Sequence, residues 1–371
     1  MCTEHATRLR GAAGGTGAAV GKADRTPVTA ADLAVQSFVT HALRRRSAQR
    51  IVAEEDSAAL EDGVLKAEVT RLFREAIRRH HSGGAGRLES ADVVALLEDR
   101  GGGDGPRWVL DPIDGTRGFM AGVGPAADER GSQYGIALAE VDELGRARVG
   151  VIGLPGFSAS FMRRLSGAGV RDGDFHGGIV LAAESGGGAW WAPIEEIGGE
   201  GSIGSARWRR CAVDARPASL RDAALVLSDS ETWCEVPLSG GGGEPPREVV
   251  HVCCGSIVKH CCVALGLANV FVQSPVATGE PLKVWDHAAA VPIVEESGGR
   301  MSGLDGRPLD MGTGATFVPP GGAVVASNGT ALHDEILQRL ARGLAAETEA
   351  QAEGRRRRFR DSVSIPNQRQ S

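Results

Sequence analysis

Residues 108–119 constrain this chain more than any other stretch of its sequence. They read Trp-Val-Leu-Asp-Pro-Ile-Asp-Gly-Thr-Arg-Gly-Phe. The apolar run Trp108–Leu110 predicts the end of a buried strand. Pro112 fixes its own φ and has no N–H to donate, so we expect the strand to stop where Asp111 and Asp114 begin. The sequence therefore predicts a buried strand that delivers two carboxylates onto a turn.

The two acids can converge on one point together with the carbonyl oxygen of Ile113. Carboxylates brought that close raise each other's pKa unless a cation lies between them. Ligands that are all oxygen suit a hard ion such as Mg²⁺. Gly115 permits the turn, and Thr116 adds a hydroxyl beside the acids. Taken alone, such a turn is better explained by a surface loop with solvated acids, so the metal site depends on partners elsewhere in the chain.

Three other segments of the chain contain further acidic residues that could join this site. Each has a plain structural explanation by itself: Asp32 as a solvated helix residue, Glu54 as a charge at a strand end, and Asp286 as a helix N-cap. Their joint occurrence with residues 108–119 is what favours a common site. The three segments are Pro27–Asp32, Ile51–Ser57 and Lys283–Ala290.

These four segments, in this order, resemble the magnesium-dependent, lithium-sensitive phosphatases of the inositol monophosphatase superfamily. Thr116–Phe119 and Lys283–His287 look most like its 3′(2′),5′-bisphosphate nucleotidase branch. The resemblance covers about residues 22–340. It implies an α/β protein built as a layered αβαβα sandwich, with an antiparallel sheet in an α+β N-terminal half and an α/β C-terminal half.

The resemblance also implies a set of metal ligands for two Mg²⁺ ions, with a third ion bound more weakly. Asp111 bridges the first two ions. Glu55 supports the ligands without coordinating an ion itself. The remaining ligands are Glu54 and the carbonyl of Ile113 for the first ion, and Asp114 and Asp286 for the second.

A proton path is expected from Thr116 to Asp32. In the resembling enzymes a hydroxyl bonded to an Asp takes a proton from a Mg²⁺-activated water, which attacks phosphorus in line without a covalent phosphoenzyme. Backbone N–H groups of Gly115 and Thr116 are expected to bind the phosphate. Asp286 should also contact the substrate, beside a helix whose positive end points at the anion.

Substrate recognition is expected at Ser256 and Lys259, which open a helix. In the bisphosphate nucleotidases the matching residues contact the non-scissile phosphate and sugar. The plain alternative is an N-cap serine and a solvated lysine. Gln273 stands where that branch usually has a base-stacking Arg, and Ser228–Glu231 lacks its usual His, so adenine recognition stays open.

Three functions remain in view. The leading one is hydrolysis of 3′-phosphoadenosine 5′-phosphate to AMP and phosphate. The second is an inositol polyphosphate 1-phosphatase or inositol monophosphatase, which would use the same metals with a different pocket. The third is a non-catalytic phosphate sensor, which the full set of acids together with Thr116 disfavours.

Composition and local pattern suggest four parts of the chain. Residues 1–21 are expected to be flexible, 22–210 to form an α+β metal-binding domain, and 211–344 an α/β substrate domain. Residues 345–371, with the run Arg355–Arg358, are expected to be a disordered tail.

Periodicity predicts individual elements within these parts. Helices are expected at 33–46, 63–79, 90–100, 256–267, 285–297 and 332–344. Strands are expected at 133–141, 147–154, 159–163, 178–183, 189–191, 220–227, 249–253, 270–273 and 323–326.

The bulk properties exclude several classes of partner. A net charge of −6 over 371 residues argues against a nucleic-acid-binding protein. No stretch is apolar and long enough to span a membrane. Cys253-Cys254 and Cys261-Cys262 lack zinc-site spacing and are interpreted as buried thiols in a reducing compartment. We therefore expect a cytoplasmic protein, with an organelle as the alternative. The resemblance implies a small phosphorylated substrate, and we expect a monomer or homodimer.

Overall fold

A computed structural model describes most of the chain. The described residues are 20–21, 27–80, 90–99, 105–121, 132–166, 177–197, 206–228, 238, 244–275, 281–329 and 331–345. The predicted flexible N-terminus and disordered tail lie outside these ranges, apart from residues 20–21 and 345. The same holds for residues 229–231 of the serine-rich segment.

Residues 108–119 begin in a seven-stranded sheet. Its order is β3-β4-β5-β6-β7-β8-β9, with β3 and β4 parallel and the other neighbours antiparallel. The strands are β3 (Arg50–Ala53), β4 (Arg107–Asp114), β5 (Gly135–Val141), β6 (Ala147–Leu154), β7 (Ile179–Glu184), β8 (Gly188–Pro193) and β9 (Arg209–Arg210).

A five-stranded sheet follows in the C-terminal part. Its order is β11-β10-β12-β16-β14; β11, β10 and β12 are parallel, whereas β16 is antiparallel to both neighbours. The strands are β10 (Ala224–Leu227), β11 (Glu248–His251), β12 (Val270–Gln273), β14 (Arg300–Gly303) and β16 (Val324–Ser327). Two small pairs stand apart, β1 (Val20–Gly21) with β2 (Pro27–Val28) and β13 (Leu282–Lys283) with β15 (Thr316–Phe317).

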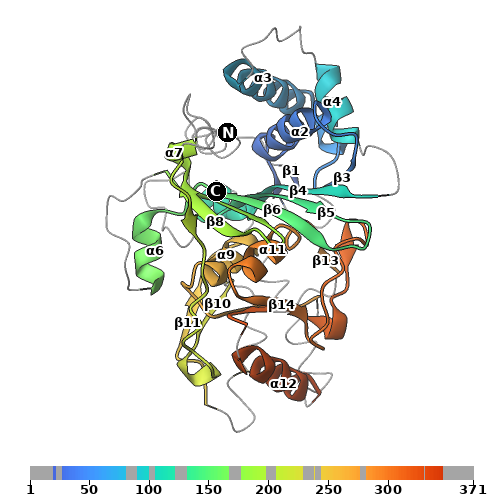
Figure 1. Ribbon diagram of the computed structural model, residues 1–371. Coiled ribbons are helices and arrows are strands. Elements are labelled where there is room, and N and C mark those ends of the chain that lie inside the picture. Colours follow the sequence, from blue (N-terminus) through green and yellow to red (C-terminus); the bar gives the residue numbers. More distant parts are fainter. Residues whose placement is uncertain are drawn as a thin grey trace, which may run out of the picture.

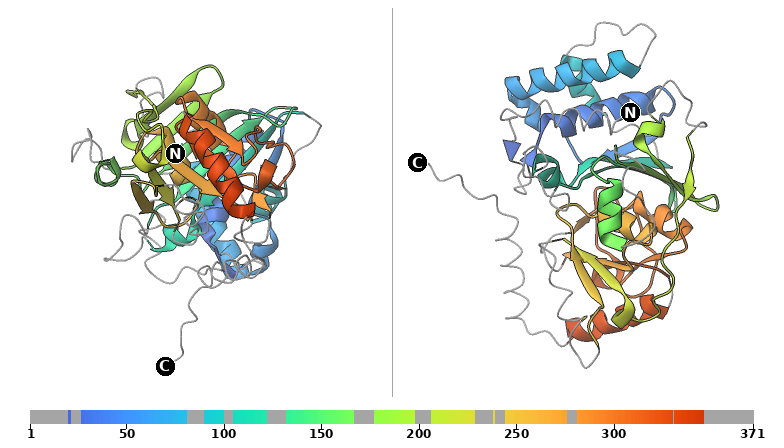
Figure 2. Two further views of the ribbon diagram at one scale, coloured as in Figure 1. Left: turned by 90° about the horizontal axis from the view of Figure 1, so that it is seen from below. Right: turned by 90° about the vertical axis from the view of Figure 1, so that its left-hand side faces the viewer.

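Helices cover both sheets and fill the space between them, so the elements stack in five layers (Figures 1 and 2). The outer layer on the larger sheet holds α2 (Ala30–Arg44), α3 (Gly63–His80) and α4 (Ser90–Glu98). The middle layer holds α9 (Ile257–Ala264) and α11 (Ala290–Glu296), and α12 (Ala331–Ala345) covers the smaller sheet. Short helices complete the described chain: η1 (Ala58–Glu61), α5 (Thr116–Ala121), α6 (Ala159–Ser166), α7 (Ile194–Ile197), η3 (Leu220–Asp222) and η5 (Pro320–Gly322).

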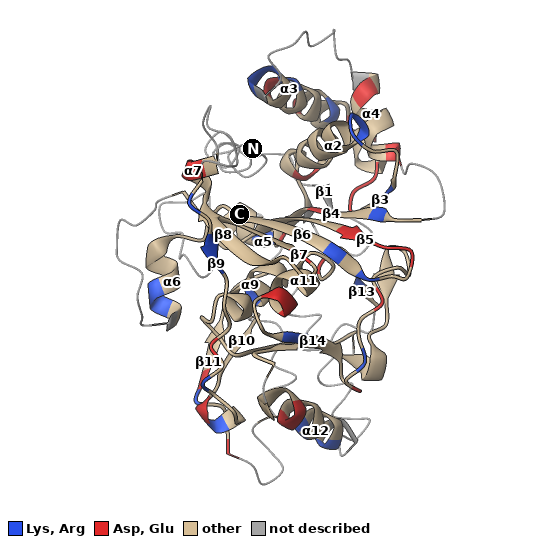
Figure 3. Ribbon diagram, viewed as in Figure 1, with Lys and Arg blue, Asp and Glu red and all other residues tan. Residues whose placement is uncertain are grey.

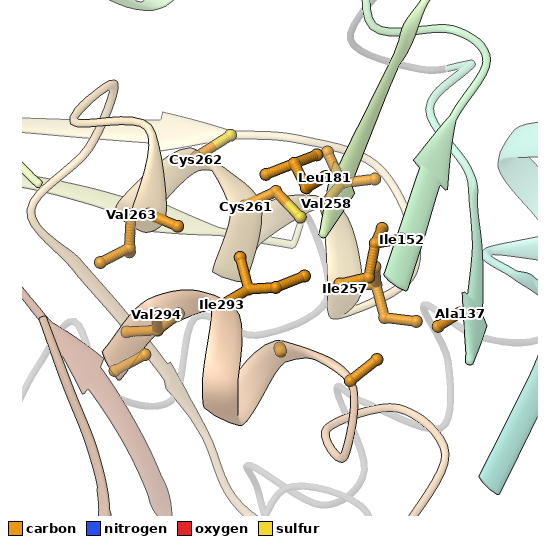
Figure 4. Packing of buried hydrophobic residues seen from close by; sticks show 14 of the residues in the cluster. Ala137, Ile152, Leu181, Ile257, Val258, Cys261, Cys262, Val263, Ile293 and Val294 are labelled. Carbon is orange, nitrogen blue, oxygen red and sulfur yellow. The ribbon is translucent and has the colours of Figure 1, made fainter. Parts of the chain in front are cut away.

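The middle layer joins the two sheets into one hydrophobic core (Figure 4). Ile152 of β6 and Val226 of β10, from different sheets, belong to the same buried cluster. Successive strand residues point to opposite faces, so Leu225 and Leu227 pack instead with α12. Charged residues lie mainly on the outer helices and in loops, as Figure 3 shows. None of the described helices combines the length and apolar character needed to cross a bilayer.

The expected fold class is confirmed, and so are most predicted elements within a few residues. The predicted strand 159–163 is wrong, because Ala159–Ser166 is the helix α6. The amide of Phe161 donates to Ser158 Oγ and that of Met162 to the Ser158 carbonyl, which starts a helical turn. The short β14 and the pair β13–β15 were not expected, since their sequences carry little β pattern.

Two expectations near the acids are also corrected. The strand does not stop at Pro112: β4 runs to Asp114, with a shift of register between Asp111 and Asp114. Proline fits there because a register shift leaves no ladder partner that needs its missing N–H. The helix expected from residue 285 begins only at Ala290, after a turn in which the amide of Ala288 donates to the Val284 carbonyl.

Candidate metal centre and active site

The end of β4 supplies two acids. The change of register between Asp111 and Asp114 frees the backbone from the regular ladder. Gly115 then adopts φ +83°, and a Cβ at this position would lie 3.2 Å from the carbonyl oxygen of Gln133. Helix α5 begins at the next residue. Both carboxylates are thereby buried at the end of the sheet, with exposures of 1% and 6%.

The first turn of α2 brings a third acid to the same end. The Thr29 side chain caps this helix, and both its amide and its hydroxyl donate to Asp32 Oδ2, at 2.8 and 2.5 Å. The Thr116 hydroxyl lies 3.2 Å from Asp32 Oδ1 and 3.3 Å from the Ile113 carbonyl oxygen. Because a hydroxyl has one proton, these two contacts compete for it. The structure therefore places the predicted Thr116–Asp32 pair in hydrogen-bond contact.

The end of β3 brings the two glutamates beside β4. The Glu54 amide donates to the Leu110 carbonyl at 3.3 Å, which extends the parallel pairing beyond the strand. Glu55 is held through its backbone, because the Gln36 side chain bonds both its carbonyl and its amide, at 2.7 and 2.9 Å. Glu55 is 3% exposed. Glu54 is half-buried, and its charge acts on Asp111.

Helix α9 supports the acids from the other sheet's side. The amides of Ser256 and Ile257 donate to the two carboxylate oxygens of Asp114, at 3.2 and 2.8 Å. Gly255, at φ +65°, makes this approach possible, since a Cβ there would lie 2.3 Å from Asp114 Oδ2. The Ser256 hydroxyl donates to the carbonyl oxygen of Asp286 at 2.9 Å, so it does not cap its own helix.

Three of these acids meet at one point. Ligand atoms of Asp111, Asp114 and Asp286 all lie within 4.8 Å of one another. Burial, followed by the nearby carboxylates, raises the pKa of Asp111 and of Asp286 well above the ordinary value. Burial raises the pKa of Asp114 to about 6, although the amides from α9 and the charge of Lys259 oppose this. The charges therefore repel one another strongly when no cation is bound.

The cluster fits a hard cation. Asp111 Oδ1 is buried and has no hydrogen-bond partner among the described residues. Burying a carboxylate oxygen without a hydrogen bond costs free energy unless another group, such as a cation, binds it. The converging side chains offer oxygen atoms alone, the ligands that Mg²⁺ or a similar ion prefers.

The predicted substrate residues adjoin this cluster. Lys259 is 1% exposed, and its ammonium group donates to the carbonyl oxygens of Cys254 and Gly255. This places the Lys259 charge behind the loop that carries the amides for Asp114. Gln273, at the end of β12, is half-buried, and its Oε1 has no hydrogen-bond partner among the described residues.

Sequence reasoning missed two features beside the site. Cys253 and Cys254 form a disulfide between adjacent residues, so their interpretation as thiols is wrong, whereas Cys261 and Cys262 are buried thiols as expected. Adjacent cysteines give no spacing signal for such a bond. The second feature is a contact between His287, next to Asp286, and His260 of α9.

Relatives with known names match nearly the whole described chain. The sequence profile of the inositol monophosphatase family matches residues 3–345. A 3′(2′),5′-bisphosphate nucleotidase of Emericella nidulans is 30% identical over 338 residues, which cover 86% of this chain and 88% of that protein. An Arabidopsis thaliana protein provisionally named a mitochondrial 3′(2′),5′-bisphosphate nucleotidase is 32% identical over 342 residues, covering 86% and 79%.

Solved structures share the fold at lower identity. The suhB protein of Bartonella henselae superposes with a TM-score of 0.55 at 17% identity, covering 94% of this chain and 95% of that one. A staphylococcal inositol monophosphatase gives a TM-score of 0.52 at 16% identity, covering 91% and 89%. Profile, relatives and fold agree with the acidic cluster, and the chain belongs to the inositol monophosphatase family of metal-dependent phosphatases.

Proposed function

We propose that the protein hydrolyses the 3′-phosphate of 3′-phosphoadenosine 5′-phosphate, giving AMP and inorganic phosphate. The observation that carries the proposal is the buried cluster of Asp111, Asp114 and Asp286 beside the Thr116–Asp32 pair. An oxygen-only cation site next to a hydroxyl that can relay a proton suits phosphate-ester hydrolysis. The names of relatives that are about 30% identical support a nucleoside bisphosphate as the substrate.

The proposed cofactor is Mg²⁺, with two or three ions per site. Bound Mg²⁺ neutralises the charge on the phosphoryl oxygens and makes water a stronger acid. Glu54, Asp111 and the Ile113 carbonyl would hold one ion. Asp114 and Asp286, with Asp111 shared, would hold the other, and Glu55 would support the set from the end of β3.

Thr116 and Asp32 are proposed to move the proton of the attacking water. Thr29 donates to Asp32 Oδ2, and the Thr116 hydroxyl lies within hydrogen-bond distance of the other carboxylate oxygen, Oδ1. When the hydroxyl donates to Asp32, its lone pairs can accept a proton from water on the substrate side. Because Asp32 is fully buried, water does not compete for its hydrogen bond with Thr116.

The phosphate is proposed to lie over the turn at Gly115. The amides of Gly115 and Thr116 lie on either side of the glycine whose φ is positive, an arrangement typical of anion-binding turns. Asp286, whose carboxylate converges with those of Asp111 and Asp114, is proposed to contact the substrate beside this turn. Because α11 starts only at Ala290, the helix end expected behind Asp286 does not contribute to this proposal.

Ser256 and Lys259 are proposed as the side of the pocket that binds the rest of the substrate. Their position next to Asp114 and Asp286 supports this. Both side chains already bond backbone carbonyls, so a second phosphate would compete with those contacts. Gln273, in place of a stacking Arg, favours an inositol phosphate as the second candidate substrate.

A phosphate-release panel tests the proposal. The substrates are 3′-phosphoadenosine 5′-phosphate, inositol 1-phosphate, inositol 1,4-bisphosphate and fructose 1,6-bisphosphate, each with Mg²⁺ and after chelation, and Thr116→Val serves as the inactive control. We expect the nucleotide to give the highest kcat/KM. A preference for an inositol phosphate would establish the second candidate, and activity that survives exhaustive chelation would exclude both.

Location and assembly belong to the same proposal. We propose a monomer or homodimer in the cytoplasm, or in an organelle as the name of the Arabidopsis relative suggests.

A further inference from the structure

Two buried histidines meet directly behind the metal ligands. His260 Nε2 and His287 Nδ1 lie 3.0 Å apart, and both residues are 0% exposed. The outward nitrogens, His260 Nδ1 and His287 Nε2, have no hydrogen-bond partner among the described residues. A neutral imidazole has one donor and one acceptor, so one ring gives its N–H to the other's lone pair. Among the described residues, the hydrogen bond between the two rings is the one polar contact that either ring nitrogen pair makes.

Aromatic neighbours hold the two rings at this contact. His260 packs edge-on against Phe271 with ring centroids 4.7 Å apart, and His287 packs edge-on against Phe317 at 5.5 Å. The Nε2–Nδ1 bond therefore joins two rings of fixed orientation. A bond between fixed groups transmits position from one backbone segment to the other.

One of the two segments that the bond joins carries Asp286, and the other, α9, donates amides to Asp114; these are the two acids of the proposed second ion. His287 directly follows Asp286, whose backbone carbonyl also accepts from Ser256 Oγ. His260 lies one turn after Ser256 on α9, and its amide donates to the Ser256 carbonyl at 3.1 Å. The same helix end binds Asp114 through the amides of Ser256 and Ile257. One helix is thus bonded to both acids or to their immediate neighbours.

Without such ties, the carboxylates of Asp114 and Asp286 would move apart, because they repel each other whenever the cation is absent. We propose that His260 is a positioning residue of this phosphatase: through its hydrogen bond to His287 it fixes the turn that carries Asp286, so that Asp286 and Asp114 face one cation. The inference rests on the proposed function only in requiring that the acids bind a divalent ion.

The pair can be tested with isosteric and non-bonding variants. Gln carries an amide near the position of Nε2, so His260→Gln keeps the bond, while His260→Leu and the shorter His260→Asn lose it. His287→Asn similarly keeps an amide near Nδ1. The matched control is His333→Leu. His333 lies on α12, is also 0% exposed, and forms hydrogen bonds with Ser302 of β14 and Ser327 of β16.

Two measurements on each variant separate positioning from packing. The first is the Mg²⁺ concentration for half-maximal activity, and the second, independent of turnover, is Mg²⁺ binding by titration calorimetry. We expect His260→Leu and His260→Asn to raise the half-maximal Mg²⁺ concentration and to weaken Mg²⁺ binding, each by about ten- to hundredfold. Losing a hydrogen-bond partner that supports a metal site usually has an effect of this size. His260→Gln, His287→Asn and His333→Leu should stay within about threefold of the wild type, although His333→Leu should lower the melting temperature.

Unchanged Mg²⁺ affinity in His260→Asn, with a lowered melting temperature, would show that the pair only fills the core and would overturn the inference. If His260→Leu does not fold, the comparison of Asn with Gln at the same position decides. A wild type that binds no Mg²⁺ would refute the proposed function instead, and with it the premise of this role.

Discussion

Replacing Asp114 by Asn should make the metal-free protein more stable while making the enzyme less active. Burial raises the pKa of Asp114 from 3.8 to about 6. Since each pKa unit corresponds to about 1.4 kcal/mol, ionised Asp114 costs the folded, metal-free protein about 3 kcal/mol at neutral pH. Below about pH 4 the carboxyl is protonated in both the folded and the unfolded chain, and the cost disappears.

The sign of the pH dependence follows from proton binding. Between pH 4 and 6 the folded protein retains a proton that the unfolded chain has lost, so the free energy of unfolding falls as pH rises through this range. Asn removes that cost but keeps a single acceptor oxygen for the two amides from Ser256 and Ile257. Losing one such bond costs about 1–1.5 kcal/mol. The net gain is therefore about 1.5–2 kcal/mol at neutral pH. With an unfolding entropy of about 2.1 cal/mol/K per residue, this raises the melting temperature of a chain of this length by about 2–3 °C.

The assay is thermal unfolding of wild type and Asp114→Asn, with chelator or with saturating Mg²⁺, at about pH 5 and at neutral pH. Chelated wild type should melt lower at neutral pH than at pH 5, and Mg²⁺ should reverse this. Chelated Asp114→Asn should melt higher than chelated wild type at neutral pH, gain less from Mg²⁺, and turn over slowly. A chelated variant that is less stable than wild type at neutral pH would refute the reasoning and make Asp114 a structural residue.

Thr116→Val should lower turnover about a hundredfold or more with little change in melting temperature, because a proton relay contributes that much; normal turnover would remove Thr116 from the proton path. Lys259→Met should lower kcat/KM on a nucleoside bisphosphate about ten- to hundredfold and affect a monophosphate far less, whereas equal losses would assign Lys259 to support of the loop at Cys254. His333 has a pKa lowered by burial to about 4, so it should destabilise the fold by up to about 3 kcal/mol as pH falls from 6.5 to 4; a pH profile that is the same in His333→Gln would contradict this. Peptide mapping without reductant should find Cys253 and Cys254 resistant to alkylation and the peptide lighter by two hydrogens; alkylation of both would disprove the disulfide.

The layered fold could be predicted because its signals are long-range patterns. A buried run that ends in acids places them at a sheet edge, and strands alternating with helices indicate an α/β half. That logic brings Asp111 and Asp114 together, as the structure has them. Asp286 needed the resemblance, because no local rule joins residues that are 172 positions apart (286 − 114 = 172).

Local competition explains what sequence reasoning could not give. Phe161 and Met162 are adjacent apolar residues that fit a strand pattern, yet the Ser158 cap decides for a helix. Pro112 predicts the end of a strand, but β4 continues past it because the register shifts between Asp111 and Asp114. The pairing of His260 with His287 depends on how α9 packs against the turn before α11, and such contacts leave no periodic pattern in the sequence.

The layer of α9 and α11 belongs to both sheets, and this determines how the chain can be divided. Helix α11 packs on β6, β7 and β8 of one sheet and on β14 of the other. A break in the segment between residues 197 and 206 would leave one fragment with a bare sheet face and the other with uncovered helices. Each would expose a large apolar surface that only the other can cover. Asp111 and Asp114 would lie on one fragment and Asp286 on the other, so the break defines a split enzyme whose activity returns only when attached binding partners bring the halves together; soluble, active expression of either half alone would contradict this.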